Sequence, residues 1–376
     1  MRKGWQWMLL AMIGPLLISG CEPTQILDET TLITVMGFDV LEDNRIRATA
    51  SAPVVSSLVS QKEQVVSATD TTLNGIMNKL DLQLDRRPKL GQLRIALYSK
   101  EMAKKGMIEF VGVMDRVEVG LRPYLGIVDG KSYDLVQADY PTQGNIGLYL
   151  YYTIYKNVRG EQLPSSTLHE FMRDYYSEGN DPYLPFIERK GNDINIKGVA
   201  LFKGDQYVDW VKPEQAFYIK LVRDQFRAGF FQLSIPTAGL GIQDQRKSNK
   251  QETSPIALET INSKKNIKLV SQHPPTFDVS VEIKARLDEM GNKPDLENTE
   301  IVKKIEREVD RKMEKEMREL VALLQKKGVD PMGFGEHYRS QNRSAHFEKE
   351  KWREMYKQAK FRFHVKTQII RLSITD

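Results

Sequence analysis

The sequence predicts an α+β fold, with mixed β-sheets flanked by helices in at least two domains. The first observation is length, because 376 residues exceed one domain of ordinary size. The second is that short β-rich runs alternate with helix-spaced runs through the first half of the chain. The third is that the second half is β-rich and then carries a long amphipathic helix and a final strand.

The beginning of the chain has the layout of an export signal. Two basic residues give a positive start, a mostly apolar run follows, and small residues precede Cys21, the only cysteine. The string Leu-Ile-Ser-Gly-Cys at 17–21 is similar to a bacterial lipobox, in which the cysteine thiol is joined to a diacylglycerol and the preceding peptide is removed. We therefore predict a lipoprotein signal peptide at residues 1–20, cleavage between Gly20 and Cys21, and lipid attachment at Cys21.

Two other interpretations of this segment are weaker. An uncleaved membrane anchor needs roughly 20 apolar residues, whereas this run has about 15 and contains Gly14 and Pro15. A buried core cysteine does not fit, because the flanking sequence is not that of a folded domain. No second stretch of about 18 apolar residues occurs, so we expect the mature protein not to span the membrane.

The balance of charges limits the partners. Removal of Arg2 and Lys3 with the signal peptide leaves 53 basic and 50 acidic side chains, a net charge of +3. This balance does not favour nucleic-acid binding, which usually needs a clustered basic face, and it is compatible with a position near anionic lipids. A single cysteine allows no intramolecular disulfide, so stability must come from the core.

The predicted N-terminal domain, residues 21–190, has a short tether followed by alternating strands and helices. A capping box, Thr167 with Glu170, marks the start of its last helix, and Gly106 is a weak point in another. Prolines and glycines at residues 179–191 predict a loop and the domain boundary. The expected strands are residues 31–40, 45–54, 93–99 and 122–128, and the expected helices are residues 70–84 (capped by Thr69 or Asp70), 100–115, 142–156 and the segment after Thr167.

The predicted C-terminal domain, residues 191–376, is β-rich and is subdivided, if at all, near residue 240. Residues 194–202 and 206–211 flank a Gly-containing turn and predict a hairpin. Pro213 follows at a position that a helix favours for its first residue. Further strands are expected at residues 230–235, 256–262, 267–272 and 277–287.

A long helix and an alternating strand end the chain. Residues 300–327 carry one apolar stripe, which we expect to pack on its own sheet rather than on a partner. Residues 361–374 alternate, with Phe361, Phe363, Val365, Thr367 and Ile369 on one face. The strand also presents Arg362, His364, Lys366, Gln368 and Arg371. Arg362, His364, Lys366 and Gln368 share the polar face, which either contacts a partner or faces solvent.

The sequence contains no recognisable catalytic motif. The histidines lack the i, i+4 spacing of a zinc-binding helix, and no second cysteine supports a structural zinc site. The pairs Gly239 with Gly241 and Gly333 with Gly335 are only fragments of phosphate-binding motifs, and no nucleophile elbow occurs. We therefore predict no catalytic residue, no metal, no cofactor and no enzymatic activity. The five histidines are His169, His273, His337, His346 and His364.

Several motifs in order resemble one family over nearly the whole chain. Besides the lipobox, these are the opening strand Val-Met-Gly-Phe-Asp at 35–39, the strand and helix at 91–106, the Gly-x-Ala-x-Phe hairpin at 198–202 with Trp210, and the Asp-Pro-Met-Gly-Phe-Gly turn at 330–335. Trp352 and a basic strand follow. The chain thereby resembles the Ger(x)C family, the C-subunit lipoproteins of nutrient germinant receptors in endospore-forming bacteria.

This resemblance implies a non-catalytic, lipid-anchored receptor subunit that is required for the response to nutrient germinants. It implies two integral-membrane partner subunits, of A and B type, and a position on the outer face of the spore inner membrane, held by lipid at Cys21. It also implies that Gly333 and Gly335 serve the fold. The alternative function is a solute-binding lipoprotein of a transport system. We disfavour it because a solute binder usually has two similar lobes around a cleft, whereas these halves differ.

Overall fold

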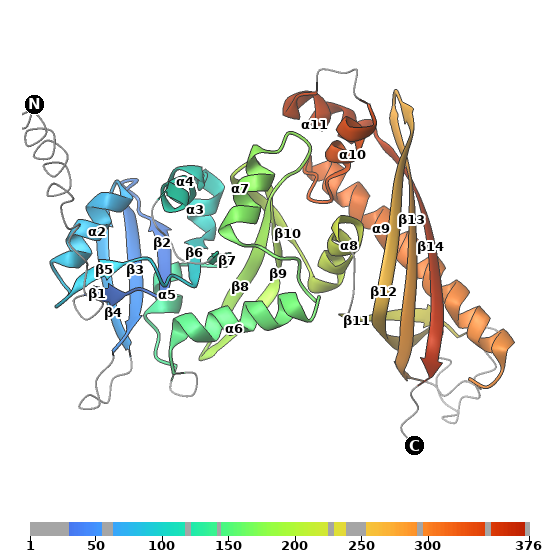
Figure 1. The fold of residues 1–376 in the computed structure, drawn as a ribbon, viewed down its shortest axis with the longest axis horizontal. Helices are drawn as coiled ribbons and strands as arrows, with labels where there is room; N and C mark the ends of the chain where they lie inside the picture. The colour runs from blue at the N-terminus through green and yellow to red at the C-terminus, as the bar shows by residue number, and fades with distance from the viewer. Residues whose placement is uncertain are drawn as a thin grey trace, which may run out of the picture.

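Two β-sheets follow one another along the length of the molecule, with helices packed on both (Figure 1). The computed structural model describes residues 30–54, 63–116, 122–140, 144–224, 229–237, 253–291, 296–342 and 347–372. Eight strands from the first part of the chain form one sheet, and four strands from the last part form the other. The predicted α+β fold class is confirmed.

The first sheet has the strand order β10-β9-β8-β7-β6-β2-β3-β4. Its central strands β2, β6, β7 and β8 are parallel, and the strands toward both edges pair antiparallel. A separate parallel pair joins β1 (Thr30–Leu32) to β5 (Arg87–Lys89). The eight strands are β2 (Val35–Val40), β3 (Ile46–Pro53), β4 (Glu63–Asp70), β6 (Ile95–Ser99), β7 (Tyr124–Val128), β8 (Tyr183–Lys190), β9 (Asp193–Lys203) and β10 (Gln206–Val211).

Helices cover both faces of this sheet because its central strands bury both. Successive strand side chains point to opposite faces, so Phe38 and Tyr98 enter one core cluster while Val35 and Leu97 enter the other. The first cluster is covered by α2 (Leu73–Asp81), α3 (Lys100–Lys105), α4 (Ile108–Arg116) and α7 (Leu168–Tyr176). The second is covered by α5 (Ser132–Val136) and α6 (Ile146–Arg159).

Two local predictions in this part are confirmed and one is wrong. The capping box of Thr167 and Glu170 opens α7, and Gly106, at φ +115°, separates α3 from α4. Neither Thr69 nor Asp70 caps α2. Both still lie in β4, and the hydroxyl of Thr72 accepts the Gly75 N–H at 3.1 Å instead.

The loop expected at residues 179–191 is largely wrong, because β8 occupies most of it. Proline lacks an N–H and is usually excluded from the inside of a sheet. Pro185 is tolerated because β7 pairs with β8 only at Phe186 and Ile187. On the side that faces β7, Pro185 therefore has no paired residue that would need its missing N–H. The proposed boundary at 190/191 falls in the turn between β8 and β9, and the hydrogen-bonded sheet continues past it to Val211.

The second sheet has the order β11-β12-β13-β14. It consists of β11 (Gly229–Pro236), β12 (Thr253–Gln272), β13 (Pro275–Met290) and β14 (Lys360–Leu372). The two strands expected at 256–262 and 267–272 are one strand. A bulge between Thr260 and Asn262 changes which residues face inward, and so interrupts the alternation that the sequence would otherwise show.

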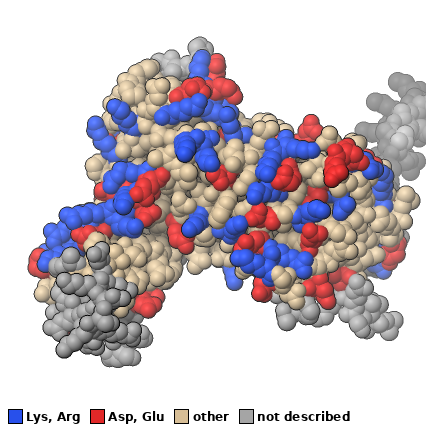
Figure 2. All heavy atoms as spheres, turned by 180° about the vertical axis from the view of Figure 1, so that it is seen from behind, with Lys and Arg blue, Asp and Glu red and all other residues tan. Residues whose placement is uncertain are grey.

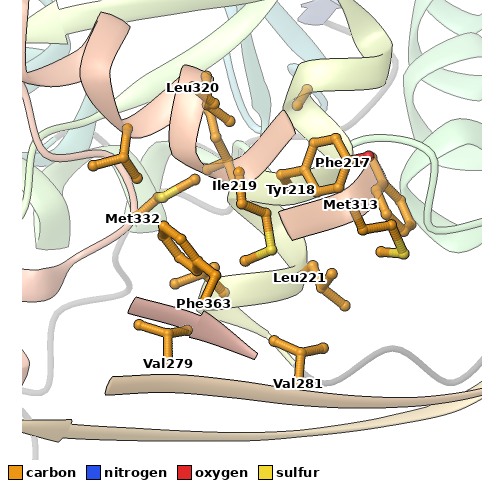
Figure 3. Packing of buried hydrophobic residues seen from close by; sticks show 14 of the residues in the cluster. Phe217, Tyr218, Ile219, Leu221, Val279, Val281, Met313, Leu320, Met332 and Phe363 are labelled. Atoms are coloured by element: carbon orange, nitrogen blue, oxygen red, sulfur yellow. The ribbon is translucent and has the colours of Figure 1, made fainter. Parts of the chain in front are cut away.

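One core joins this sheet to its helices α8 (Pro213–Arg223), α9 (Thr299–Lys327), α10 (Phe334–Gln341) and α11 (Lys349–Gln358). The apolar stripe of α9 is buried against the sheet and α8, as predicted, and Figure 3 shows Met313 and Leu320 among α8 residues and Val279, Val281 and Phe363. The same core includes Val199, Leu201 and Val211 from the first sheet. The division into 21–190 and 191–376 therefore stays a proposal, with α8 packed between the two sheets (Figure 1).

The free edge of β14 is covered by carboxylates from α9. The backbone N–H groups of Val365, Thr367 and Ile369 donate to Glu314, Asp310 and Glu306 at 3.2, 2.7 and 2.7 Å. These acids are four residues apart, so they lie on one side of α9. We call them the acid ladder.

Candidate functional site

The predicted lipidation and cleavage residues, Cys21 and Gly20, lie outside the described residues. The description begins at Thr30 in β1. No helix among the described residues is long and apolar enough to cross a membrane. Lipid attachment at Cys21 therefore stays a prediction.

The opening motif Gly37-Phe38-Asp39 builds a buried helix cap. The Asp39 carboxylate accepts the backbone N–H groups of Ser132 and Tyr133, at 2.7 and 2.8 Å, and the Ser132 hydroxyl at 2.9 Å. A carboxylate at a helix N-terminus satisfies donors that have no partner within the helix. A Cβ on Gly37 would lie 2.8 Å from the Ser132 Oγ, so only glycine fits there. The motif therefore positions α5 on the sheet.

A charged cluster lies at the carboxyl ends of the parallel strands, where open α/β sheets usually bind ligands. Asp129, just after β7, accepts Lys100 at 3.1 Å and Lys197 at 2.7 Å, and Lys197 also lies 4.9 Å above the Trp210 ring. Burial raises the pKa of Asp129, but these hydrogen bonds outweigh burial and hold the pKa below its usual value. The acid is thus already neutralised by its own chain.

Two of the depressions among the described residues lie beside charged side chains and are considered as solute sites. One, of about 370 Å³, adjoins this cluster and is lined in part by Gly130, Lys131 and Arg189. The other, of about 700 Å³, lies over the loop after α7 and is lined by Arg173, Tyr176 and neighbouring polar residues. Neither is a cleft between two similar lobes, because the sheets beside them differ in size and topology.

The Asp-Pro-Met-Gly-Phe-Gly turn forms a buried, hydrogen-bonded junction between the two sheets. The buried Asp330 carboxylate accepts the N–H groups of Gly333 and Gly335, both at 2.9 Å, and the indole N–H of Trp352 at 3.0 Å. Its backbone N–H donates to the carboxylate of Asp181 at 3.0 Å, and its carbonyl accepts the Asp181 N–H at 3.0 Å. Asp181, ahead of β8, also accepts Arg353 from α11 at 2.9 Å. We call this set the Asp330 junction.

Close backbone contact explains the glycines of this turn. Gly335 lies against Gly179, and a Cβ on Gly335 would lie 2.6 Å from both the Gly179 Cα and the Trp352 Nε1. Gly333 has φ +78° and begins α10, and a Cβ there would overlap the Asn180 side chain. Both glycines are therefore fold residues and not part of a phosphate site.

A buried ion pair supports the same junction. Arg223, at the end of α8, donates to both carboxylate oxygens of Asp174 on α7, at 2.7 and 2.8 Å, and to the Pro331 carbonyl at 3.1 Å. Its guanidinium also lies 4.9 Å from the centre of the Tyr183 ring. Removing one partner of such a pair leaves a buried charge unpaired, which is strongly destabilising. The pair links helices of both sheets and was not foreseen from the sequence.

The polar face of the final strand is exposed. Arg362, His364 and Lys366 all face solvent, and Arg362 pairs only loosely with Asp278, at 3.6 Å. The side chain of Arg371 lies outside the described residues. Figure 2 views the molecule from the side opposite to Figure 1, and there basic and acidic side chains are intermixed. Within the described residues no group of three or more His, Cys, Asp or Glu could hold a metal ion.

These features define an α+β protein with two large sheets, whose motif residues hold the fold together. Comparison with known proteins places such a chain in a family. The model described as "Spore germination protein N-terminal domain" matches residues 23–189, and that described as "Spore germination B3/ GerAC like, C-terminal" matches residues 197–373. The chain belongs to the Ger(x)C family of spore germination proteins, and as a member it is not an enzyme.

Relatives cover the chain from end to end. The spore germination protein GerQC of Bacillus cereus is 26% identical over 374 residues, which is 99% of each chain. The putative spore germination protein YfkR of Bacillus subtilis (strain 168) is 24% identical, and the similarity covers 95% of this chain and 94% of YfkR. The crystal structure of the GerBC protein shares the fold, with a TM-score of 0.53 at 15% identity over 89% of this chain and 96% of that one.

Proposed function

We propose that the protein is the non-catalytic, lipid-anchored C subunit of a spore germinant receptor and is required for the response to nutrient germinants. The observation that carries this proposal is the match of two spore germination models to nearly the whole chain, in order. The motif residues support the fold, which is consistent with a role that depends on contact and not on chemistry.

The proposed partners are two integral-membrane receptor subunits, of A and B type, and the membrane lipid that Cys21 would enter. The proposed location is the outer face of the spore inner membrane. A protein without catalytic groups can bias its partners only by binding their conformational states with different affinities. The Asp330 junction favours this role, because it joins the two sheets through the hydrogen bonds between Asp181 and Asp330 and the partly buried ion pair of Arg353 with Asp181.

Deletion of the gene tests the function. We expect spores without it to lose the response to one set of nutrients, while germination by a route that bypasses nutrient receptors persists. Unchanged germination with every nutrient set would refute the role. Reintroduction of the intact gene is the control, and it should restore the lost response.

The anchor is tested separately with Cys21→Ala. Two acyl chains hold a protein stably on a membrane, whereas one binds only marginally. The variant should therefore incorporate no labelled fatty acid and should be retained less strongly in the membrane fraction. Undiminished label in the variant would exclude Cys21 as the attachment site without touching the receptor assignment.

Titration of the purified protein with amino acids and sugars separates the receptor role from the alternative of a solute-binding lipoprotein. A receptor component that acts through contact should show no tight, saturable binding. Tight binding would favour solute capture, with the depressions beside Asp129 and Arg173 as the first places to look.

A further inference from the structure

One face of the second sheet is open along three strands. In β13 the residues Phe277, Val279 and Val281 point into the core, whereas Glu282 and Lys284 are exposed on the other side. In Figure 1 α9 passes behind β12, β13 and β14, so the helix and the open face lie on opposite sides of the sheet. Asp278, Ser280, Glu282 and Lys284 of β13 mark this outer face.

The register sets charges side by side across the outer face. Asp278 lies between Lys268 and Arg362, and Glu282 lies between Lys264 and Lys366. Lys284 occupies the same face two residues further on, between uncharged neighbours. Levels two residues apart are about 6.6 Å apart along a strand. We call the five cations at these levels the basic strip: Lys264, Lys268, Lys284, Arg362 and Lys366.

The basic strip has an uncompensated positive charge. Its five cations enclose the two acids Asp278 and Glu282, which leaves a formal charge of +3. Only Arg362 forms an ion pair, at 3.6 Å, and no ion pair joins the four lysines to any other described residue. Three aliphatic side chains on the same face, Ile261, Val270 and Ile370, are each exposed by 41–43%.

We propose that the basic strip is the docking surface for an acidic segment of a partner protein. Charge complementarity predicts that the partner is negatively charged, because three net positive charges on a flat sheet attract and orient an acidic surface. The pattern favours a polypeptide over a lipid surface. A uniformly anionic bilayer would press against Asp278 and Glu282 as well, whereas a segment can place its acids over the two outer strands.

The position of the strip and the mode of contact agree with this assignment. The second sheet lies at the opposite end of the molecule from β1 (Figure 1), and the chain between Cys21 and Thr30 can span at most about 30 Å. The point at which Cys21 would enter the bilayer therefore lies nearer the first sheet, and this step rests on the proposed anchor. Because the acid ladder already bonds outward N–H groups of β14, the segment contacts side chains on the face and adds no strand at that edge.

Photo-cross-linking in spores tests the proposal with the full-length protein. A photoreactive amino acid replaces Lys366 or, as the matched control, Lys303 on the exposed side of α9. We expect a protein adduct from position 366, with an acidic cross-linked peptide, and none from position 303. Adding Lys264→Glu should lower the yield at least tenfold, and adding Arg307→Glu should not. A lipid adduct, or no protein adduct at position 366, would overturn the proposal.

Vesicles provide the second arm. Full-length Cys21→Ala protein is mixed with vesicles that contain phosphatidylglycerol, and is compared with the pairs Lys264→Glu/Lys366→Glu and Lys303→Glu/Arg307→Glu. We expect no vesicle binding that depends on the strip. Binding lost only in the first pair would assign the strip to anionic lipid and refute a protein partner. Neither readout uses germination, so failure here is distinguishable from failure of the receptor role.

Discussion

Replacing Asp330 with asparagine should weaken the Asp330 junction by a predictable amount. The carboxyl group serves three buried donors, and one of its oxygens accepts both Gly335 N–H and Trp352 Nε1–H. Protonation does not remove this capacity, because a hydroxyl oxygen still accepts a hydrogen bond. In Asp330→Asn the remaining carbonyl can keep those two bonds, but the new amide then faces the Gly333 N–H. The Gly333 N–H loses its shorter hydrogen bond, of 2.9 Å, and keeps only the one to the Asp330 carbonyl at 3.3 Å, which costs about 1–3 kcal/mol in the free energy of unfolding.

The loss of stability in Asp330→Asn should depend on pH in a defined direction. Burial is the main cause that raises the pKa of Asp330, to about 7. Between about pH 4 and 7 the unfolded chain has released this proton and the folded protein retains it, so wild-type stability falls as pH rises, by up to about 1.4 kcal/mol per pH unit. Asparagine does not ionise. The variant should therefore be most impaired, relative to the wild type, near pH 4–5 and least impaired at pH 7 and above.

Urea unfolding of the mature protein measures this effect. In a Trp210→Phe background Trp352 is the only tryptophan left after signal removal, so its fluorescence reports on the junction itself. Asp193→Asn, at an exposed position beside the turn between β8 and β9, is the control and should shift stability by less than about 0.5 kcal/mol. An unchanged unfolding midpoint for Asp330→Asn, or a deficit that grows as pH rises, would refute the reasoning.

Three further predictions follow from the same features. Expression from Glu22 onward should give a monodisperse, folded protein in the absence of detergent; persistent insolubility would indicate an interface that needs membrane partners. Gly335→Ala should destabilise the protein by about 1–3 kcal/mol, as overpacked sites do, in thermal unfolding, because its Cβ would lie 2.6 Å from the backbone of Gly179; an unchanged melting temperature would contradict the close packing. Arg362→Glu with Lys366→Glu should leave the circular-dichroism melt intact but slow germination, and normal germination in the stable double variant would assign this face to solvent.

Patterns that depend on neighbours in sequence were predictable. The stripe of α9 and the alternation of β14 repeat at the periods of a helix and a strand, and both describe the burial that the structure shows. The Thr167 capping box and the break at Gly106 are likewise set by residues only a few positions apart.

Features that depend on distant pairing were not predictable. Pro182 and Pro185 predict a loop, yet β8 forms because the pairing of β7 with β8 begins just past Pro185. The Asp330 junction joins residues 149 positions apart, and no spacing in one sequence shows that Asp181 and Asp330 meet. A partial signal existed, since aspartate, proline and glycine close together are typical of a turn, but this signal does not show which distant residue the turn meets.

The acid ladder has a consequence for many copies of this protein crowded on one surface. A long, open strand edge would let neighbouring molecules join strand to strand, as in aggregates and swapped assemblies. Here an incoming strand must first displace Glu306, Asp310 and Glu314, and these residues belong to a helix whose other side is locked into the core. Neighbouring copies can therefore lie in contact without polymerising through β14, so each copy stays a separate molecule.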